Sequence, residues 1–148
     1  MLSVIIDARG APDGLPILLA QLTAGAVDGL VRQVLIVAAP GQPAIDHLCE
    51  DMGAEEHPTL ESAGAVARSD QLLILPAGFR LRDGWIKTIE SHLVRGAGPA
   101  VVTGFSEAGL FGRRPFGVLV ERSRLEGRRG ADLQRLRRDL GLRAGRVG

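Results

Sequence analysis

The chain is poor in aromatic residues and cysteine and has no long apolar run, and each shortage excludes a class of protein. Aromatic residues make up 3% of the 148 residues and hydrophobic residues 45%, so we expect an aliphatic core of Leu, Val, Ile and Ala. The lone Cys49 excludes an internal disulfide and is expected to be a small buried hydrophobe in a reducing compartment. No apolar run approaches the roughly 20 residues that span a bilayer, and residues 1–7 are typical of a first strand rather than of a signal peptide. We therefore expect a single cytoplasmic domain over residues 1–148.

The net charge of +1 conceals a strong asymmetry along the chain. Residues 1–112 contain 7 Lys and Arg against 13 acids, a balance of −6, whereas residues 113–148 contain 11 Arg against 4 acids, a balance of +7. A basic helical segment is predicted at about 131–148, and its apolar stripe is expected to pack on the body of the domain. Contact with a membrane surface is not favoured because the stripe is short and has no Trp or Phe anchor, and no nucleic-acid partner is expected. The stripe consists of Leu133, Leu136 and Leu140.

Short apolar runs alternate with helical spacing through the first half of the chain. Runs of strand type occupy residues 3–6, 34–37 and 72–75, and helical patterns separate them. Parallel strands require such crossovers, which cover both faces of the sheet. The pattern therefore predicts an α/β fold, a three-layer sandwich with a mostly parallel central sheet, in which ligands bind beyond the carboxyl ends of the strands. Those ends are residues 7–10, 38–41 and 76–80.

Capping and helix-breaking residues predict where the helices begin and end. Asp13 is expected to cap a first helix that ends near Gly25, and Asp83 is expected to cap a later helix that carries Trp85. The remaining expected elements are helices near 43–52, 60–68 and 132–140, and strands near 55–57, 100–105 and 117–120.

The order of motifs along nearly the whole chain resembles that of a known family. The most specific stretch is Ala65–Leu75, a small-residue helix followed by an Ala-Arg-Ser-Asp turn and an apolar strand. Leu81–Trp85 adds a leucine, a short polar turn and a Gly-Trp that enters a helix, and Gly109–Gly117 leads to a strand and an Arg-Ser-Arg turn. Together with strands 2–6 and 34–37, these stretches resemble bacterial family-two glycosyltransferases, which are nucleotide-diphospho-sugar transferases of the GT-A fold.

The chain departs from that family at the residues that would hold a metal ion. After the first strand the family continues Pro-Thr-x-Asn, where this chain has Asp7-Ala8-Arg9-Gly10. The second strand of the family ends in Asp-Asp-Gly-Ser, where this chain has Ala38-Ala39-Pro40-Gly41. The metal-binding Asp-x-Asp of the family is replaced by Pro76-Ala77-Gly78. The resemblance therefore implies a shortened transferase with no metal site and no cofactor.

The resemblance also implies a nucleotide-diphospho-sugar as partner, bound at the carboxyl ends of the strands. The nucleotide would lie over the loop after the first strand, and residues after the second and fourth strands would line the cleft. An arginine could face the diphosphate in place of a metal ion, because its forked donors match phosphate oxygens. The residues implied for binding are Asp7, Ala8, Arg9, Ala38 and Gly78, with Arg80 or Arg113 at the diphosphate.

Two acidic residues have an alternative structural role. Asp132 is the candidate for the catalytic base that deprotonates the acceptor, but an acid before a helix is also suited to capping its first amides. Asp7 may be described in the same two ways, as a site residue or as an acid that bonds to backbone amides of its own loop.

Three functions are consistent with this pattern. The leading one is a glycosyltransferase-like protein that binds a nucleotide-sugar through a degenerate, metal-poor catalytic centre. The first alternative is an active, metal-independent glycosyltransferase that stabilises the diphosphate with Arg80, Arg113 or Arg114. The second is a non-catalytic scaffold or partner-binding protein. A sugar nucleotidyltransferase shares the fold but has a Gly-rich, basic loop after the first strand, of which residues 7–11 are a poor version.

Overall fold

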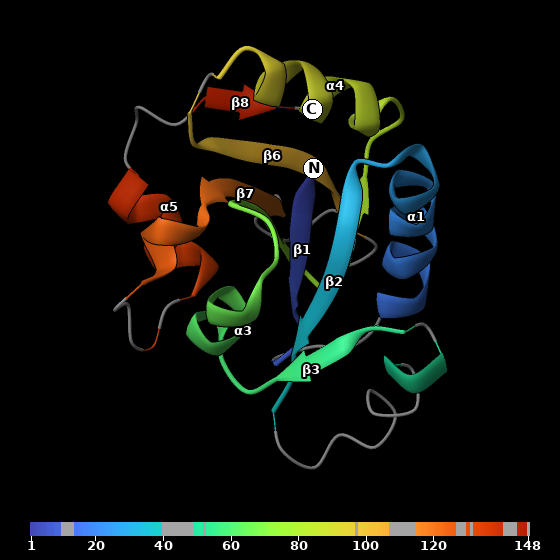
Figure 1. The fold of residues 1–148 in the computed structure, drawn as a ribbon, viewed down its shortest axis with the longest axis vertical. Coiled ribbons are helices and arrows are strands. Elements are labelled where there is room, and N and C mark those ends of the chain that lie inside the picture. The colour runs from blue at the N-terminus through green and yellow to red at the C-terminus, as the bar shows by residue number, and fades with distance from the viewer. Residues whose placement is uncertain are drawn as a thin grey trace.

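The computed structural model describes residues 1–9, 14–39, 49–51, 53–96, 98–106, 115–126, 130, 132–140 and 145–147. In this part of the chain one eight-stranded sheet lies between two layers of helices (Figure 1). The strands are β1 (Leu2–Asp7), β2 (Val31–Val37), β3 (Glu55–His57), β4 (Gln71–Pro76), β5 (Phe79–Leu81), β6 (Ala100–Ser106), β7 (Phe116–Glu121) and β8 (Gly145–Val147). The helices are α1 (Leu15–Asp28), α3 (Leu60–Val66), α4 (Trp85–Val94), the 3-10 helix η1 (Arg122–Leu125) and α5 (Leu133–Leu140).

Half of the sheet is parallel, as the alternation of strands and helices predicts. Its strands lie in the order β3-β2-β1-β4, with all three pairings parallel. The continuous apolar run of β1 is buried from Leu2 to Ile6, because helices cover both faces of this strand. β1 lies at the centre of this half, between the two other long strands.

The other half of the sheet is antiparallel except for the pairing of β8 with β6, so the sheet is mixed and the expectation of a mostly parallel sheet needs correction. β7 pairs antiparallel with both β4 and β6, and β5 pairs antiparallel with β6. No long crossover separates β4 from β5, which are joined by Ala77 and Gly78 alone. Parallel neighbours need a crossover of a dozen residues or so. β5 accordingly does not pair with β4 and pairs with β6 instead.

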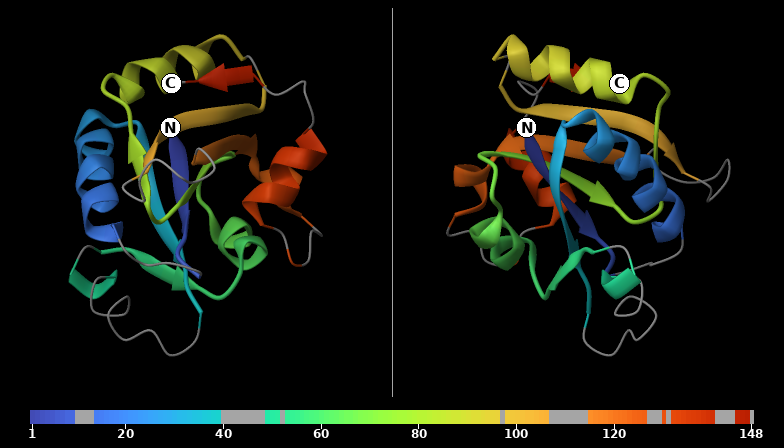
Figure 2. Two further views of the ribbon diagram at one scale, coloured as in Figure 1. Left: turned by 180° about the vertical axis from the view of Figure 1, so that it is seen from behind. Right: turned by 45° about the vertical axis from the view of Figure 1, so that its right-hand side comes forward.

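Two separate cores lie on the two faces of the sheet, which makes the three layers. α1 and α5 lie on opposite sides of the central strands, as Figures 1 and 2 both show. Leu18 and Leu22 of α1 and Ile89 of α4 pack on one face, and Leu60 of α3 and Leu136 of α5 pack on the other. The side chains of β1 alternate between these cores, with Val4 and Ile6 in the first and Ile5 in the second.

The helix ends differ from the predicted ones where a glycine takes over the role of an acid. The N-cap of α1 is Gly14 and that of α4 is Gly84, both left-handed, so Asp83 does not cap α4; Asp13 lies outside the described residues. Gly25 does not end α1, which continues to Asp28 and ends at Gly29. A Cβ added to Gly25 would lie 2.5 Å from Cη2 of Trp85, so this glycine allows the close approach of α1 to α4.

The basic C-terminal segment packs on the body through its apolar side. Leu133 and Leu136 are 9% and 2% exposed and belong to the second core. β8 pairs parallel with β6, a strand that the sequence pattern does not indicate. Within the described residues no helix is long and apolar enough to cross a membrane.

Candidate functional site

Three strand ends meet at one edge of the sheet, which we call the carboxyl edge. Asp7, at the end of β1, is level with Val37 of β2 and with Pro76 of β4. The chain continues the pairing beyond the strands, because the amide of Ala8 donates to the Val37 carbonyl at 2.8 Å and the amide of Ala77 donates to the Asp7 carbonyl at 3.1 Å. The carboxyl edge therefore brings together four of the residues predicted for binding. They are Asp7, Ala8, Ala38 and Gly78.

Asp7 and Arg9 form a two-point ion pair at this edge. Nε and Nη2 of Arg9 donate to Oδ1 and Oδ2 of Asp7 at 3.0 and 2.9 Å, and the Arg9 amide also donates to Oδ1 at 3.2 Å. The side chains are 31% and 17% exposed. The hydrogen bonding of Arg9 to the Asp7 carboxylate is the main cause that raises the pKa of Arg9, and it outweighs the opposing effect of burial. Asp7 thus caps its own loop and orients Arg9, and the binding roles of both residues stay a prediction.

Asp132 reaches the same edge from the far end of the chain. Its charge also raises the pKa of Arg9, which lies 123 positions earlier. Its Oδ1 accepts the amide hydrogen of Arg135 at 2.8 Å, so Asp132 caps α5. The capping role is therefore present. Its role as catalytic base stays a prediction.

The turn after β4 lies against the start of α1. A Cβ added to Gly14 would lie 3.6 Å from the Cα of Gly78, so the first turn of α1 adjoins Ala77–Gly78. The N-terminus of a helix carries a partial positive charge and attracts anions. Arg80 follows two residues later in β5, opposite Phe105, and is partly exposed. Arg113, the other candidate for the diphosphate, lies outside the described residues.

Among the described residues of this edge, the side chains do not suit a divalent cation. Mg²⁺ and Mn²⁺ prefer carboxylate and other oxygen ligands, and Ala38, Ala77 and Gly78 have no oxygen in their side chains. The carboxylate of Asp7 is already bound by Arg9 at two points. Within the described residues, no group of three or more His, Cys, Asp or Glu is placed to hold a metal ion.

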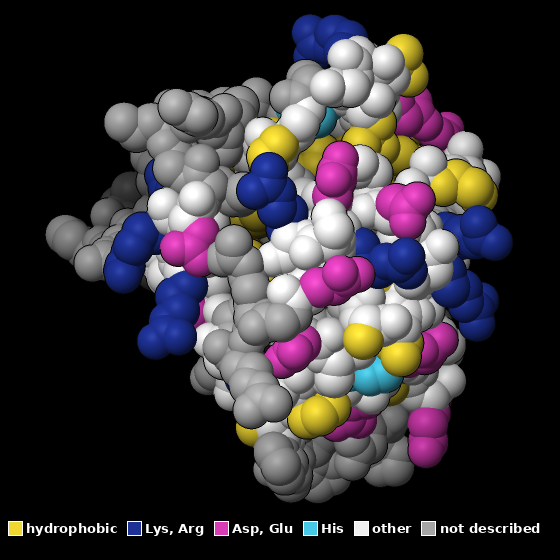
Figure 3. Space-filling model, turned by 60° about the vertical axis from the view of Figure 1, so that its left-hand side comes forward, with side chains coloured by type: hydrophobic (Ala, Val, Ile, Leu, Met, Phe, Trp, Pro, Cys, Tyr) yellow, Lys and Arg dark blue, Asp and Glu magenta, His cyan; other side chains and the backbone are white. Residues whose placement is uncertain are grey.

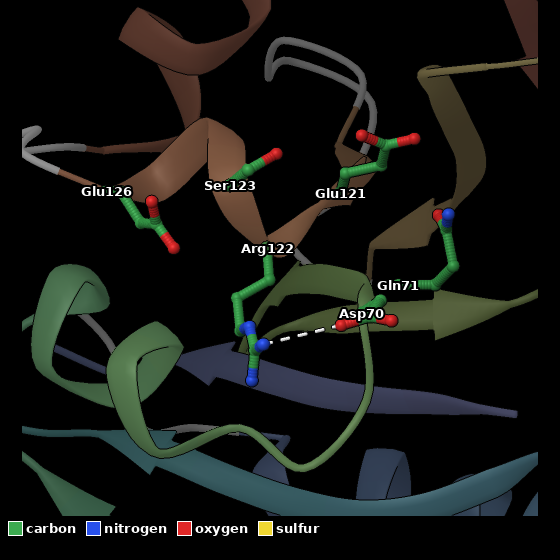
Figure 4. A pocket seen from close by; sticks show the side chains of 6 residues that line it. All are labelled: Asp70, Gln71, Glu121, Arg122, Ser123 and Glu126. Carbon is green, nitrogen blue, oxygen red and sulfur yellow. Dashed lines mark hydrogen bonds and ion pairs between the residues drawn. The ribbon is translucent and has the colours of Figure 1, made fainter.

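A pocket of about 380 Å³ lies at the opposite end of β4, which we call the amino edge. Nη2 of Arg122 is 3.4 Å from Oδ1 of Asp70, and Nη1 donates to the carbonyl of Ala67 at 2.8 Å (Figure 4). Asp70 therefore lies at the opposite end of its strand from Gly78, as predicted, and the pocket is separate from the carboxyl edge. The residues that line it are Asp70, Gln71, Glu121, Arg122, Ser123 and Glu126.

Two cation–π contacts were not indicated by the sequence pattern. The guanidinium of Arg137 lies 4.6 Å from the ring centroid of Phe116, and that of Arg82 lies 4.6 Å from the ring centroid of Phe105. Phe116 starts β7 and Phe105 lies near the end of β6, so each pair joins residues that are distant in sequence. On the face shown in Figure 3, hydrophobic side chains are uncovered in small groups between charged ones.

Comparisons with known proteins identify the fold. No protein-family model and no curated protein matches the sequence. A solved 4-diphosphocytidyl-2C-methyl-D-erythritol synthase is similar with a TM-score of 0.65 and 12% identity, over 99% of this chain and 87% of that chain. Mannosyl-3-phosphoglycerate synthase from Rubrobacter xylanophilus is similar with a TM-score of 0.55 and 18% identity, over 69% of this chain and 38% of that chain. Glucosyl-3-phosphoglycerate synthase from Mycobacterium tuberculosis, solved with Mn²⁺, UDP and glucosyl-3-phosphoglycerate, has a TM-score of 0.54 and 15% identity, over 70% and 43% of the two chains.

These similarities show that the chain has a fold like that of the three synthases. The chain covers 38% and 43% of the length of the two phosphoglycerate synthases. At such low identity the likeness concerns the fold, and the function has to be argued from the site.

Proposed function

We propose that this chain binds a nucleotide-diphospho-sugar at the carboxyl edge without a bound metal ion, as a glycosyltransferase-like protein with a degenerate catalytic centre. The observation that carries the proposal is the Ala77–Gly78 turn, which follows β4 at the level of Asp7, adjoins the start of α1 and has no carboxylate. A diphosphate is attracted by the positive end of a helix, and an acid-free turn does not repel it. The UDP in the structure of the similar glucosyl-3-phosphoglycerate synthase supports the choice of a nucleotide.

The arginines at this edge take different roles in the proposal. Asp7 orients Arg9 and balances its charge, so we assign Arg9 to hydrogen bonding with the nucleoside. Arg80, two residues after Gly78, is assigned to the diphosphate, where a planar fork of donors suits phosphate oxygens. Ala8 and Ala38 are buried in the first core, so they support the strand ends from within and the proposal assigns them no direct contact with the nucleotide.

One observation favours a second candidate function, an active transferase that needs no metal ion. Asp132 lies near enough to Arg9 to affect its pKa, which brings a carboxylate to the proposed site. A carboxylate there could accept the proton of an acceptor hydroxyl, the role of a general base. Arg80 would then stabilise the leaving diphosphate. Product formation distinguishes this candidate from a binding protein.

Calorimetric titration tests the proposal directly. The full chain is titrated with UDP-, GDP- and dTDP-sugars, each with and without Mn²⁺, and we expect binding that Mn²⁺ does not strengthen. CTP and UTP are added to the series, since binding of a nucleoside triphosphate in preference to every nucleotide-sugar would favour a nucleotidyltransferase. Binding that requires Mn²⁺ would contradict the proposal, and no binding of any nucleotide would favour a scaffold.

A pair of substitutions at Gly78 isolates the effect of charge. Gly78 does not have a positive φ, so the backbone accepts a side chain there. Gly78→Asp places a negative charge at the turn and is expected to weaken metal-free nucleotide binding, whereas Gly78→Asn has nearly the same size without the charge. We expect no efficient turnover from Gly78→Asp with Mn²⁺, because the residues after β2 supply no acid either. Equal effects of the two substitutions would place the diphosphate elsewhere.

A further inference from the structure

Arg137 is a cation held in place by an aromatic ring. Its guanidinium lies over Phe116, which is 8% exposed, while Arg137 itself is exposed. Arg137 lies one helical turn after Leu133, at the border of the packed side of α5, so its stem can follow the core to the ring. Within the described residues Arg137 has no ion-pair partner. Its hydrogen-bond donors are therefore not used by a carboxylate of the described part of the chain.

The position of Phe116 places this cation at the carboxyl edge. β7 runs antiparallel to β4, with Val118 opposite Ile74. A Cβ added to Gly117 would meet the side chain of Leu75, so Phe116 comes level with Pro76, next to the Ala77–Gly78 turn. Phe116 belongs to the core under α5, whereas Ala77 belongs to the core under α1. Arg137 and the start of α1 therefore approach the same edge from opposite faces of the sheet.

We propose that Arg137 is an anion-binding residue for the acceptor, and that the acceptor of this protein carries a phosphate or carboxylate group. The inference rests on the proposed function, in which the diphosphate of the donor lies on the α1 side. Asp132, the candidate base, precedes α5 and caps it, so the same short segment supplies the base and a fixed cation. A guanidinium that is already oriented loses less freedom on binding an anion, and its fork matches two oxygens at once.

A titration with inorganic phosphate tests this assignment. It is carried out at constant ionic strength and followed by NMR through the Nε–H signals of arginine. In the wild-type spectrum, phosphate is expected to shift one arginine Nε–H signal. The spectrum of Arg137→Gln is expected to lack that signal, which assigns it to Arg137. Arg137→Gln is expected to weaken phosphate binding roughly tenfold, the order of one charge-assisted hydrogen bond, and to leave UDP binding unchanged. Arg138→Gln is the matched control, because Arg138 is the exposed next residue of α5 with the same charge.

The outcomes separate this inference from the proposed function. Equal weakening by Arg137→Gln and Arg138→Gln would overturn the inference, since it would indicate a diffuse positive surface. Weakening of UDP binding by Arg137→Gln would also overturn it and assign Arg137 to the donor. If the wild-type chain does not bind UDP but binds phosphate through Arg137, the anion site stands and the proposed function fails. Phe116→Leu, which keeps the charge and removes the ring, is expected to weaken phosphate binding less than Arg137→Gln.

Discussion

Acidic side chains are distributed differently at the two edges of the sheet. At the amino edge, Asp70, Glu121 and Glu126 line one pocket, and the neighbouring carboxyl group of Asp28 raises the pKa of Glu90. At the carboxyl edge, Asp7 is bound at two points by Arg9, and Asp132 caps α5. The described acids of the carboxyl edge are thus already engaged by the protein, whereas several at the amino edge face solvent. An edge of this kind favours an anionic ligand over a cation.

Each edge also has an Asp–Arg pair, and the two pairs differ in geometry. The Asp7–Arg9 pair has two short contacts, and its carboxylate is 17% exposed. The Asp70–Arg122 pair has one contact of 3.4 Å, and its carboxylate is 90% exposed. Forked, partly buried pairs hold their geometry better than exposed single contacts, which are screened by water and salt. We therefore expect the side chains of the carboxyl edge to hold more fixed positions than those of the amino edge.

The largest effect is expected from adding a methyl group at the carboxyl edge. Gly104→Ala would press a Cβ against Cζ of Phe79 and the carbonyl oxygen of Arg80, and the backbone cannot move aside as a side chain can. We expect the free energy of unfolding, measured by urea denaturation, to fall by about 3 kcal/mol.

Gly64→Ala is the counterpart in the layer next to η1. Its nearest contact would be Cδ1 of Leu125 at 2.9 Å, the end of a flexible side chain. Helix propensity favours Ala over Gly by about 1 kcal/mol, so we expect a net change smaller than that. Equal losses from the two substitutions would remove the difference in rigidity between these regions.

An intermediate effect is expected from neutralising one carboxylate at each edge. Asp7→Asn removes the charge of the forked pair and is expected to lower the free energy of unfolding by about 1 kcal/mol. Asp70→Asn is the matched control at the amino edge and is expected to cost less than about 0.5 kcal/mol. Both are measured by urea denaturation at low and high salt, and a larger loss from Asp70→Asn would reverse the comparison.

The smallest effect concerns pH and the amino edge. The pKa of Glu90 is raised above its ordinary value of 4.5, chiefly by hydrogen bonding with Asp28 and then by burial and the charge of Asp28. The positive charges of the Met1 amino group and Lys87 act in the opposite direction. Because the folded state then holds the proton of Glu90 more tightly than the unfolded state, the contribution of this group to stability is fully present below pH 4.5 and is lost as the pH rises through the folded pKa.

Glu90→Gln tests this by removing the titrating group and keeping a side chain that can donate to Asp28. We measure the unfolding temperature as a function of pH. Over that pH window we expect it to fall less in the variant than in the wild type. Glu126→Gln, an exposed acid of the pocket, is the control. The same fall in Glu90→Gln as in the wild type would show that Asp28 and Glu90 are not coupled.

Much of the fold follows from local patterns. Continuous apolar runs predict β1, β2 and β4, because strands covered on both faces need apolar side chains at every position. Since parallel strands end at one edge, the same runs bring Asp7, Ala38 and Gly78 together. β5 and β8 were not predicted in this way, since each owes its place to pairing with β6 and has no apolar run of its own.

The missed part of the candidate site depends on contacts between distant elements. The Asp7–Arg9 pair is close in sequence, and opposite charges two residues apart after a strand were a signal that could have indicated it. No such signal joins Asp132 to Arg9 or Arg137 to Phe116, because packing of α5 on the sheet creates both contacts.

The sequence by itself determined the alternation of strands and helices, the aliphatic core and the lack of acids after β2 and β4, because hydrophobic spacing and side-chain chemistry are local properties. The tertiary structure alone decided that β7 joins β4 and β6 in antiparallel pairing, that Asp132 comes near enough to Arg9 to raise its pKa and that Arg137 lies over Phe116. These depend on which face of each element is buried against which neighbour, and burial is a property of the whole packed chain.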